Sequence, residues 1–306
     1  MSGAQNGTVW ADGRLRDWST LSVPLMSDAV VRSVAVFDGL RADLTEDGRI
    51  RMLAGRAHVR RLIRSARALR LPVAYGVEDI LLACAEVARA ELEGTGYTVG
   101  YVRPMVLAAA LTEQAKESSL TIAAFGRAAS IPAPVRLQVS ALRRPAPDSV
   151  PPQVKAVANY QLSRLSRLAA HAAGYDDALL LNQHGRLAES AGAAVLMECD
   201  GRLITPPAWE GCLPSITVDV LDRLAGVLGI PFAREPVLLN SIWSADGLAL
   251  AGTLADLVQV QTVDDLGVPA GPELAALRTA YAAALDTADA DPRHVEQLAF
   301  AEFPAS

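Results

Sequence analysis

The chain has 306 residues, of which 51% are hydrophobic, 20% charged and 5% aromatic, and its net charge is -6. This balance is typical of a globular protein with a large core and one or two domains. The negative charge argues against a nucleic-acid partner, and no apolar run reaches the roughly 18 residues that a membrane span requires. We expect no secretory signal. We also expect no metal site and a reducing cytoplasm, because the cysteines and histidines are few and widely spaced.

The first 126 residues predict a small α/β domain. Short strands flank the Asp12-Gly13 turn, and Gly94 or Gly96 ends the second of two amphipathic helices. In chain order we predict two strands within 7–16, a strand at 33–42, helices at 56–70 and 77–93, and strands at 98–111 and 119–125.

Residues 127–134 (RAASIPAP) contain two prolines and favour an interdomain linker. A larger domain over 135–306 follows. Its predicted strands are 135–141, 176–181, 193–198, 202–205, 247–251 and 256–263, and its predicted helices are 159–173, 215–228 and 271–286. The tail from residue 288, which contains Pro292 and Pro304, is predicted to be loosely held.

Lysine is scarce in this chain, which has only Lys116 and Lys155. Lys116 lies in a polar turn, whereas Lys155 follows a double proline and has apolar neighbours. A buried lysine can lose its proton and form a Schiff base, which arginine cannot do. A solvated lysine is the plain alternative, and the motifs that follow Lys155 weigh against it.

Several motifs lie at this lysine or after it in the chain. They are Lys155-x4-Tyr160, His171 to Leu181, Gly185-Arg-Leu-Ala-Glu189-Ser, Leu203 to Pro207, Leu213-Pro-Ser-Ile-Thr217 and Ala251-Gly-Thr253. Together they resemble the class IV aminotransferases, which use pyridoxal 5′-phosphate (PLP), and within them the branched-chain enzymes. The resemblance implies a two-domain α/β (α+β) fold of type IV with the active site at the domain junction. It also implies a homodimer in which the neighbouring subunit completes the site.

The resemblance implies that Lys155 is the catalytic residue. It would bond to the PLP aldehyde and move the substrate proton, for which its pKa must fall below the usual value of about 10.4. Tyr160 would hydrogen-bond the phenolate oxygen of PLP, and Glu189 would pair with the pyridine nitrogen. Taken alone, Tyr160 is also an ordinary helix aromatic and Glu189 a solvated turn residue.

The same resemblance implies a phosphate site. Arg61, rather than its neighbour Arg60, matches the phosphate-binding arginine, whose planar fork suits a phosphate. Ile216 and Thr217 would offer backbone N–H groups at a helix start, and Thr253 would add a hydroxyl. The plain alternative for that helix start is an ordinary N-cap.

Substrate residues are also implied. Tyr101 and Arg103, which alternation places on one face of a strand, resemble the pair at the substrate carboxylate in branched-chain enzymes. Phe37, Thr253 and Leu254 would also contact the substrate. The predicted strand at 98–111, which carries Tyr101 and Arg103, has no Arg-x-His pair of the kind typical of the D-amino-acid branch, so an L-amino acid is predicted.

Some positions depart from the family pattern. Arg32 replaces an aromatic residue, Asp38 a glutamate, Ala194 an asparagine and Ser215 a glycine. A charge beside an apolar substrate must be hydrated or paired. Arg32 therefore predicts a donor with a polar or anionic side chain, as in specialised metabolism, unless Arg32 points to solvent.

We thus predict a PLP-dependent aminotransferase with an altered side-chain pocket, and two alternatives stay open. One is a lyase of the same fold, such as aminodeoxychorismate lyase; Tyr101 and Arg103 favour the transaminase over it. The other is a relative that binds the cofactor without catalysis; Lys155, Tyr160 and Glu189 argue against that.

Overall fold

The computed structural model describes residues 7–110, 117–128, 132–149, 151–286 and 291–305. They form two compact units. The first takes its described residues from 1–130, 154–158 and 299–306, and the second from 131–153 and 159–298. Each unit combines helices with a sheet, so the predicted α/β (α+β) class is confirmed. No helix within the described ranges is long and apolar enough to cross a membrane.

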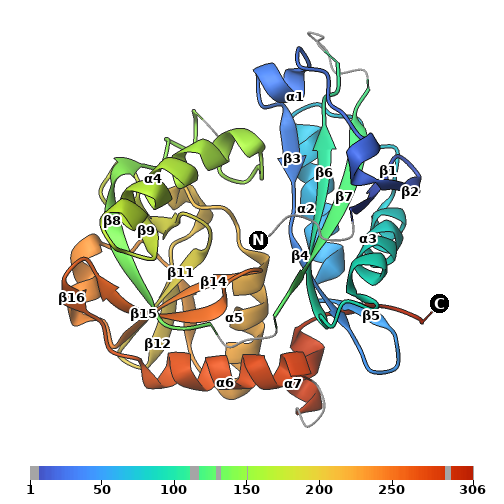
Figure 1. Ribbon diagram of the computed structural model, residues 1–306. Coiled ribbons are helices and arrows are strands. Elements are labelled where there is room, and N and C mark those ends of the chain that lie inside the picture. The colour runs from blue at the N-terminus through green and yellow to red at the C-terminus, as the bar shows by residue number, and fades with distance from the viewer. Residues whose placement is uncertain (1–6, 111–116, 129–131, 150, 287–290, 306) are drawn as a thin grey trace. The chain divides into compact units, whose positions relative to one another are not determined.

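The first unit is built on an antiparallel sheet with the strand order β17-β5-β4-β6-β7-β1-β2, and β3 also pairs with β6 (Figure 1). The strands are β1 (Thr8–Ala11), β2 (Arg14–Asp17), β3 (Ala35–Phe37), β4 (Leu40–Leu44), β5 (Ile50–Met52), β6 (Val99–Leu107), β7 (Ser119–Arg127) and β17 (Ala301–Phe303). The short helices η1 (Trp18–Thr20) and α1 (Asp28–Val31) lie between β2 and β3 in the chain.

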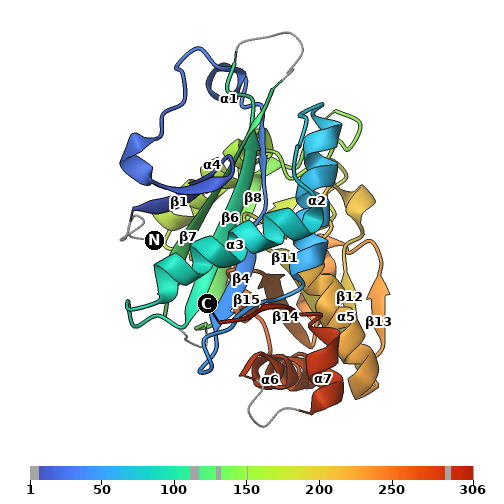
Figure 2. The ribbon, with the colours of Figure 1, turned by 90° about the vertical axis from the view of Figure 1, so that its right-hand side faces the viewer.

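Two longer helices, α2 (Gly55–Ala68) and α3 (Val77–Leu92), pack against this sheet. Figure 2 shows α3 lying across β6 and β7. Both helices were predicted from their apolar periodicity and are confirmed. The buried face of α2 also carries His58, Arg61 and Ser65, so this helix brings polar groups into the unit's interior.

The second unit has a mixed sheet with the order β10-β9-β8-β15-β14-β11-β12-β13, and β16 pairs with β15. The strands are β8 (Val135–Arg143), β9 (Asp177–Leu181), β10 (Leu187–Ser190), β11 (Ala194–Cys199), β12 (Arg202–Thr205), β13 (Phe232–Arg234), β14 (Gly247–Gly252), β15 (Asp256–Val263) and β16 (Leu266–Gly267). The 3-10 helices η2 (Val157–Asn159), η3 (Ala208–Glu210) and η4 (Leu239–Ser244) lie in the connections.

Helices cover this second sheet. α4 (Tyr160–Ala172) packs on β8 and β9, while α5 (Ile216–Leu228) and α6 (Pro272–Asp286) pack on β14 and on each other. A shorter helix, α7 (Pro292–Gln297), contacts α5 and α6. The predicted helices at 159–173, 215–228 and 271–286 are confirmed within two residues at each end.

Two predictions about elements were wrong. The single strand predicted at 33–42 is two strands, because the chain breaks after Phe37 and resumes at Leu40. The tail predicted to be loose instead forms α7 and β17 over its described part, and β17 pairs antiparallel with β5. The partner of β17 lies far earlier in the chain, so no local pattern could indicate this pairing.

Candidate active site

Lys155 is held by backbone hydrogen bonds within the first unit. Its N–H donates to Ser65 Oγ at 3.1 Å, and its carbonyl oxygen accepts the Phe37 N–H at 3.1 Å. The flanking residues Val154 and Ala156 are buried in the same core as α2 and α3. The lysine backbone is therefore fixed on both sides by packing rather than carried on a free loop.

The aromatic ring of Phe37 brings two cations together. Lys155 Nζ lies 5.2 Å from the ring centre and Arg103 Cζ lies 4.9 Å from it. Arg103 also lies over the Tyr101 ring, and its Nη2 donates to the Tyr101 hydroxyl at 3.3 Å. Within the described residues, the buried Nε of Arg103 has no hydrogen-bond partner. Four of the predicted site residues thus gather at one place in the first unit.

Arg61 is buried on α2, whereas Arg60 beside it is exposed. The Arg61 guanidinium donates from Nε and Nη2 to the two oxygens of Asp38, each at 2.8 Å. A buried guanidinium is the arrangement expected of an anion-binding arginine, and it favours Arg61 over Arg60 for the predicted phosphate contact.

Arg32 lies apart from that group in its contacts. It follows α1, its Nη1 lies 2.7 Å from Asp28 Oδ1, and its side chain is 58% exposed. Among the described residues the guanidinium is thus both exposed and paired with Asp28. Its role in substrate selection stays a prediction.

Glu189 lies on β10 in the second unit and is held by two donors. Arg144 Nε lies 3.2 Å from Oε1, and the Leu213 N–H donates to Oε2 at 3.1 Å. Arg144 is itself buried and donates to the Gly211 carbonyl oxygen at 2.9 Å. Sequence reasoning missed Arg144 as a partner of the acid.

The predicted phosphate-side residues of this unit lie at two chain turns. Ile216 and Thr217 are buried in the first turn of α5, and Ser215 Oγ accepts the Val218 N–H as the helix N-cap. Thr253 and the exposed Leu254 form the turn between β14 and β15. Tyr160 is the first residue of α4 and is half-buried.

A thiol lies close to the acid but cannot act as a nucleophile at neutral pH. Burial raises the pKa of Cys212 to about 12, and the Glu189 carboxylate adds to this effect. The thiol remains protonated and donates to the carbonyl oxygens of Pro206 and Pro207. Cys212 is therefore not a candidate nucleophile of the second unit.

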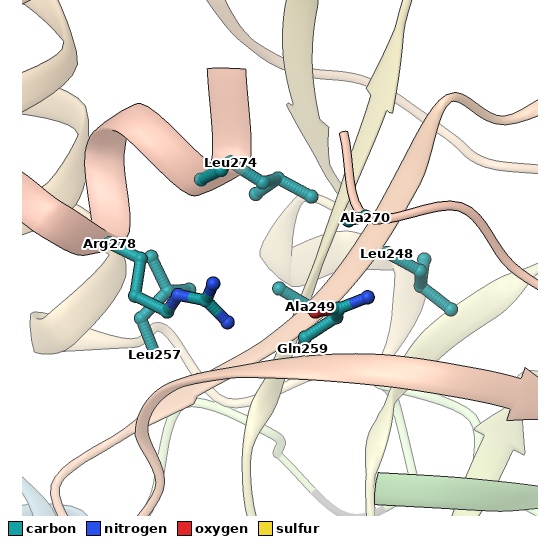
Figure 3. Close-up of a pocket in the computed structure, with 8 residues that line it drawn as sticks. Leu248, Ala249, Leu257, Gln259, Ala270, Leu274 and Arg278 are labelled. Atoms are coloured by element: carbon teal, nitrogen blue, oxygen red, sulfur yellow. The ribbon is translucent and has the colours of Figure 1, made fainter. Parts of the chain in front are cut away.

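Figure 3 shows a recess between α6, β14 and β15 of the second unit. Its volume of about 10 Å³ corresponds to roughly one water molecule. The lining residues are Leu248, Ala249, Leu257, Gln259, Ala270, Leu274, Ala275 and Arg278, none of which is a predicted site residue. The recess is too small for a substrate or cofactor.

Comparisons with known proteins decide the family. The family model described as amino-transferase class IV matches residues 35–263. The chain belongs to this family. The branched-chain-amino-acid aminotransferase of Escherichia coli K12 is 30% identical over 273 residues, covering 86% of this chain and 87% of that enzyme. A probable branched-chain-amino-acid aminotransferase of Aquifex aeolicus is 27% identical over 259 residues and covers 83% of each chain.

Solved structures of branched-chain aminotransferases share the whole fold. The enzyme of Thermoproteus uzoniensis with norvaline matches with a TM-score of 0.88 and 27% identity, covering 98% of this chain and 99% of that one. The PLP form of the enzyme of Thermobaculum terrenum matches with a TM-score of 0.86 and 27% identity, covering 97% of this chain and 98% of that one. The fold type IV architecture predicted for this aminotransferase is confirmed.

The donors of this aminotransferase fit the chemistry of a phosphorylated pyridine aldehyde. The first unit supplies an amine at Lys155 and a buried guanidinium at Arg61. The second supplies a carboxylate at Glu189 and the N-terminus of the 13-residue helix α5. The amine can bond to an aldehyde, and the guanidinium and the helix N-terminus can each bind a phosphate. The carboxylate can pair with a ring nitrogen.

Proposed function

We propose that this PLP-dependent aminotransferase moves an amino group between an L-amino acid and a 2-oxo acid. The observation that carries the proposal is the pair of cations on Phe37, with Lys155 Nζ at 5.2 Å and Arg103 Cζ at 4.9 Å from the ring centre. An amino acid carries its mobile proton and its carboxylate on adjacent carbons, so a base beside a carboxylate binder suits it. The buried Arg103 Nε supports this, because such a group ordinarily has a partner.

Bound PLP supplies the aldehyde that takes up the amino group and the ring that acts as an electron sink. Lys155 Nζ would take the proton from the substrate Cα and deliver it to the carbon that was the aldehyde carbon of the cofactor. The face of Phe37 and the fixed lysine backbone limit where that amine can lie. Arg103 and Tyr101 bind the substrate carboxylate, which orients Cα towards the amine.

Glu189 holds the proton on the pyridine nitrogen of the cofactor. Its carboxylate is oriented by Arg144 and by the Leu213 N–H, which bind different oxygens. A carboxylate fixed in this way keeps one geometry towards the ring. As the family resemblance implies, Arg61, Ile216, Thr217 and Thr253 would bind the phosphate, and Tyr160 would bind the phenolate oxygen.

A half-reaction assay tests this function. Purified protein should show the absorbance of bound PLP in the visible range, and a panel of L-amino acids should convert it to the aminated cofactor. Borohydride reduction followed by peptide mapping should place the cofactor on Lys155. Because Lys116 is the chain's other lysine, the map has two possible outcomes, and labelling at Lys116 would contradict the assignment. Elimination from the substrate without transfer to 2-oxoglutarate or pyruvate would instead indicate the lyase.

We also propose that the enzyme is a homodimer. Large apolar side chains are exposed within one short stretch of the first unit: Trp18, Val23, Leu25, Met26, Val30 and Val31. Leu25 is 77% exposed, and such a concentration of apolar surface marks an interface. Light scattering should give twice the 32.3 kDa chain mass. The free thiols at Cys84, Cys199 and Cys212 are in keeping with a cytoplasmic enzyme.

An altered side-chain pocket is the last part of the proposal. Ala194 pairs with Ala251 on β14, two residues before Thr253, so a methyl group stands where the family has an amide. Arg32 adds a guanidinium where the family has an aromatic ring. Both changes favour a donor other than leucine or isoleucine.

A further inference from the structure

Asp38 is a fully buried carboxylate between β3 and β4, with 0% of its surface exposed. Its Oδ2 accepts from Arg61 Nε at 2.8 Å, and its Oδ1 accepts from Arg61 Nη2 and from the Gly39 N–H, each at 2.8 Å. His58 Nδ1 lies 2.8 Å from the same Oδ1. Four donors therefore converge on one buried side chain, and two of them belong to Arg61.

The charges of this cluster can be assigned. Burial alone would raise the pKa of Asp38, but the Arg61 guanidinium and the His58 imidazole outweigh it and hold that pKa well below its usual range. Burial lowers the pKa of His58, although Asp38 acts in the opposite direction. At neutral pH Asp38 is ionised and accepts only, so the neutral His58 donates its Nδ1–H. The carboxylate thus balances one arginine and binds one imidazole.

The geometry fixes the plane of the Arg61 guanidinium. Asp38 occupies the edge formed by Nε and Nη2 in a bidentate pair, which removes the rotation that a single hydrogen bond would allow. Arg61 and His58 lie one turn apart on α2, and Ser65 on the same helix accepts the Lys155 N–H. One helix face therefore sets both the guanidinium and the lysine backbone.

We propose that Asp38, aided by His58, is a positioning residue that fixes Arg61 for the phosphate group of the cofactor. The inference rests on the proposed function and deepens it. A guanidinium that is already oriented loses little side-chain freedom when the phosphate arrives. Asp38 should therefore affect the phosphate group of PLP and not its ring or aldehyde.

PLP and pyridoxal, which lacks the phosphate, separate this role from a structural one. Absorbance titration of the apoenzyme gives the Kd of each, and their ratio reports the phosphate contribution. Arg61→Ala sets the full size of that contribution. Asp38→Asn, which keeps the size of the side chain but removes its charge, should lower PLP affinity by about tenfold or more and change pyridoxal affinity by less than about threefold.

Asp43→Asn is the matched control. Asp43 is another buried carboxylate of the first unit, with Arg41 Nε 2.9 Å from its Oδ1 and Arg51 Nη2 3.6 Å from its Oδ2. This variant should lower the melting temperature without changing the Kd ratio. If Asp38→Asn does not fold, His58→Gln can be measured instead. It should lose PLP affinity by a smaller factor, again with little change in pyridoxal affinity.

The outcomes are distinct. If Asp38→Asn loses affinity for PLP and for pyridoxal by the same factor, or keeps its PLP affinity, the positioning role is overturned. A wild type that transaminates would still uphold the proposed function. In the His58→Gln experiment an unchanged Kd ratio would overturn the positioning role in the same way. A wild type that binds neither PLP nor pyridoxal would instead refute the proposed function itself.

Discussion

At the scale of residues, the two charged groups of the second unit's site depend on each other. Glu189 is oriented by Arg144, and Arg144 is in turn held by the carbonyl oxygen of Gly211. Each side chain is buried or nearly so, which makes their mutual contact strong and their separate removal costly. The acid proposed to hold the ring proton is thus oriented by Arg144.

Glu189→Gln should retain most of the bound PLP yet lose most of the half-reaction rate. The amide preserves the side chain's size but cannot keep the pyridine nitrogen protonated, so the ring becomes a weaker electron sink. Single-turnover absorbance measurements with saturating donor check this. Glu198→Gln, which changes another buried glutamate of the same unit, should leave the rate unaltered. Unchanged transamination in Glu189→Gln would mean that Glu189 has only a structural role on β10.

The scarcity of lysine drew attention to Lys155, and the resemblance to the family motifs nominated Arg61 and Glu189. The partners of these groups were not predictable, because Asp38 and Arg144 reach them only through the fold. Asp38 is separated from Arg61 by 23 residues and lies on a different element. A charged residue directly after an apolar strand was the one available hint that a buried partner existed.

At the scale of elements, the start of α6 is held by a side chain from another strand. Glu198 on β11 accepts the Leu274 N–H at 2.8 Å, which satisfies one of the free donors in the first turn of the helix. Gly271, with a φ of +68°, leaves the space that this carboxylate occupies, and a Cβ there would overlap Glu198 Oε2. A long-range contact thus replaces a local N-cap.

Gly271→Ala should therefore lower the free energy of unfolding by about 1–3 kcal/mol, more than a strained backbone alone would explain. Gly229→Ala is the control, because Gly229 has a similar φ of +74° but no atom within 4 Å of the point that an alanine Cβ would occupy. Chemical denaturation of both variants measures the difference. Equal losses of unfolding free energy in the two variants would show that the Glu198 side chain moves aside at no energetic cost.

The five longer helices, α2 to α6, were predictable because apolar residues recur in them at helical spacing. The short helices α1 and α7 were not predicted. The strands were harder where pairing is long-range. β13 pairs in parallel with β12, and β17 pairs with β5. Each of these strands has only three residues, too few for an alternating pattern to identify it. The break between β3 and β4 was missed because apolar residues continue on both sides of Asp38.

At the scale of the whole molecule, the free energy of unfolding should fall on acidification in two separate pH ranges. The folded-state pKa of His58 is lowered, so below about pH 6.5 the unfolded chain takes up a proton that the folded chain does not. The folded-state pKa of Asp38 is also lowered, so its stabilisation is present above about pH 3.9 and is lost below it. Both effects act in the same direction.

His58→Gln should reduce the loss of stability between pH 7.5 and 5.5, to which this one group contributes at most about 1.4 kcal/mol per pH unit. Melting temperatures across that range provide the measurement. His184→Gln serves as the control because His184 is exposed. An unchanged pH dependence in His58→Gln would show that the imidazole already carries a proton in the folded protein.

The choice of amino donor is also a property of the assembled enzyme. We expect the wild type to favour L-glutamate or another polar donor over L-leucine in kcat/KM, and Arg32→Tyr to move this ratio towards leucine. Arg56→Tyr, which replaces another exposed and paired arginine of the first unit, should leave the ratio unchanged. Efficient leucine turnover by the wild type with no response to Arg32→Tyr would contradict the altered pocket and leave the aminotransferase assignment intact.

The first unit is assembled from distant parts of the chain, and this has a consequence for biosynthesis. Residues 154–158 cover the edge at Phe37 and β17 pairs with β5, so this unit recruits strands from late in the chain. During synthesis an N-terminal domain ordinarily folds before the rest has been made. Here the nascent unit keeps an open edge at β5 until Phe303 has left the ribosome. A ribosome stalled after residue 134 would therefore expose an incomplete sheet to chaperones and proteases, and the segment that carries Lys155 would still be missing.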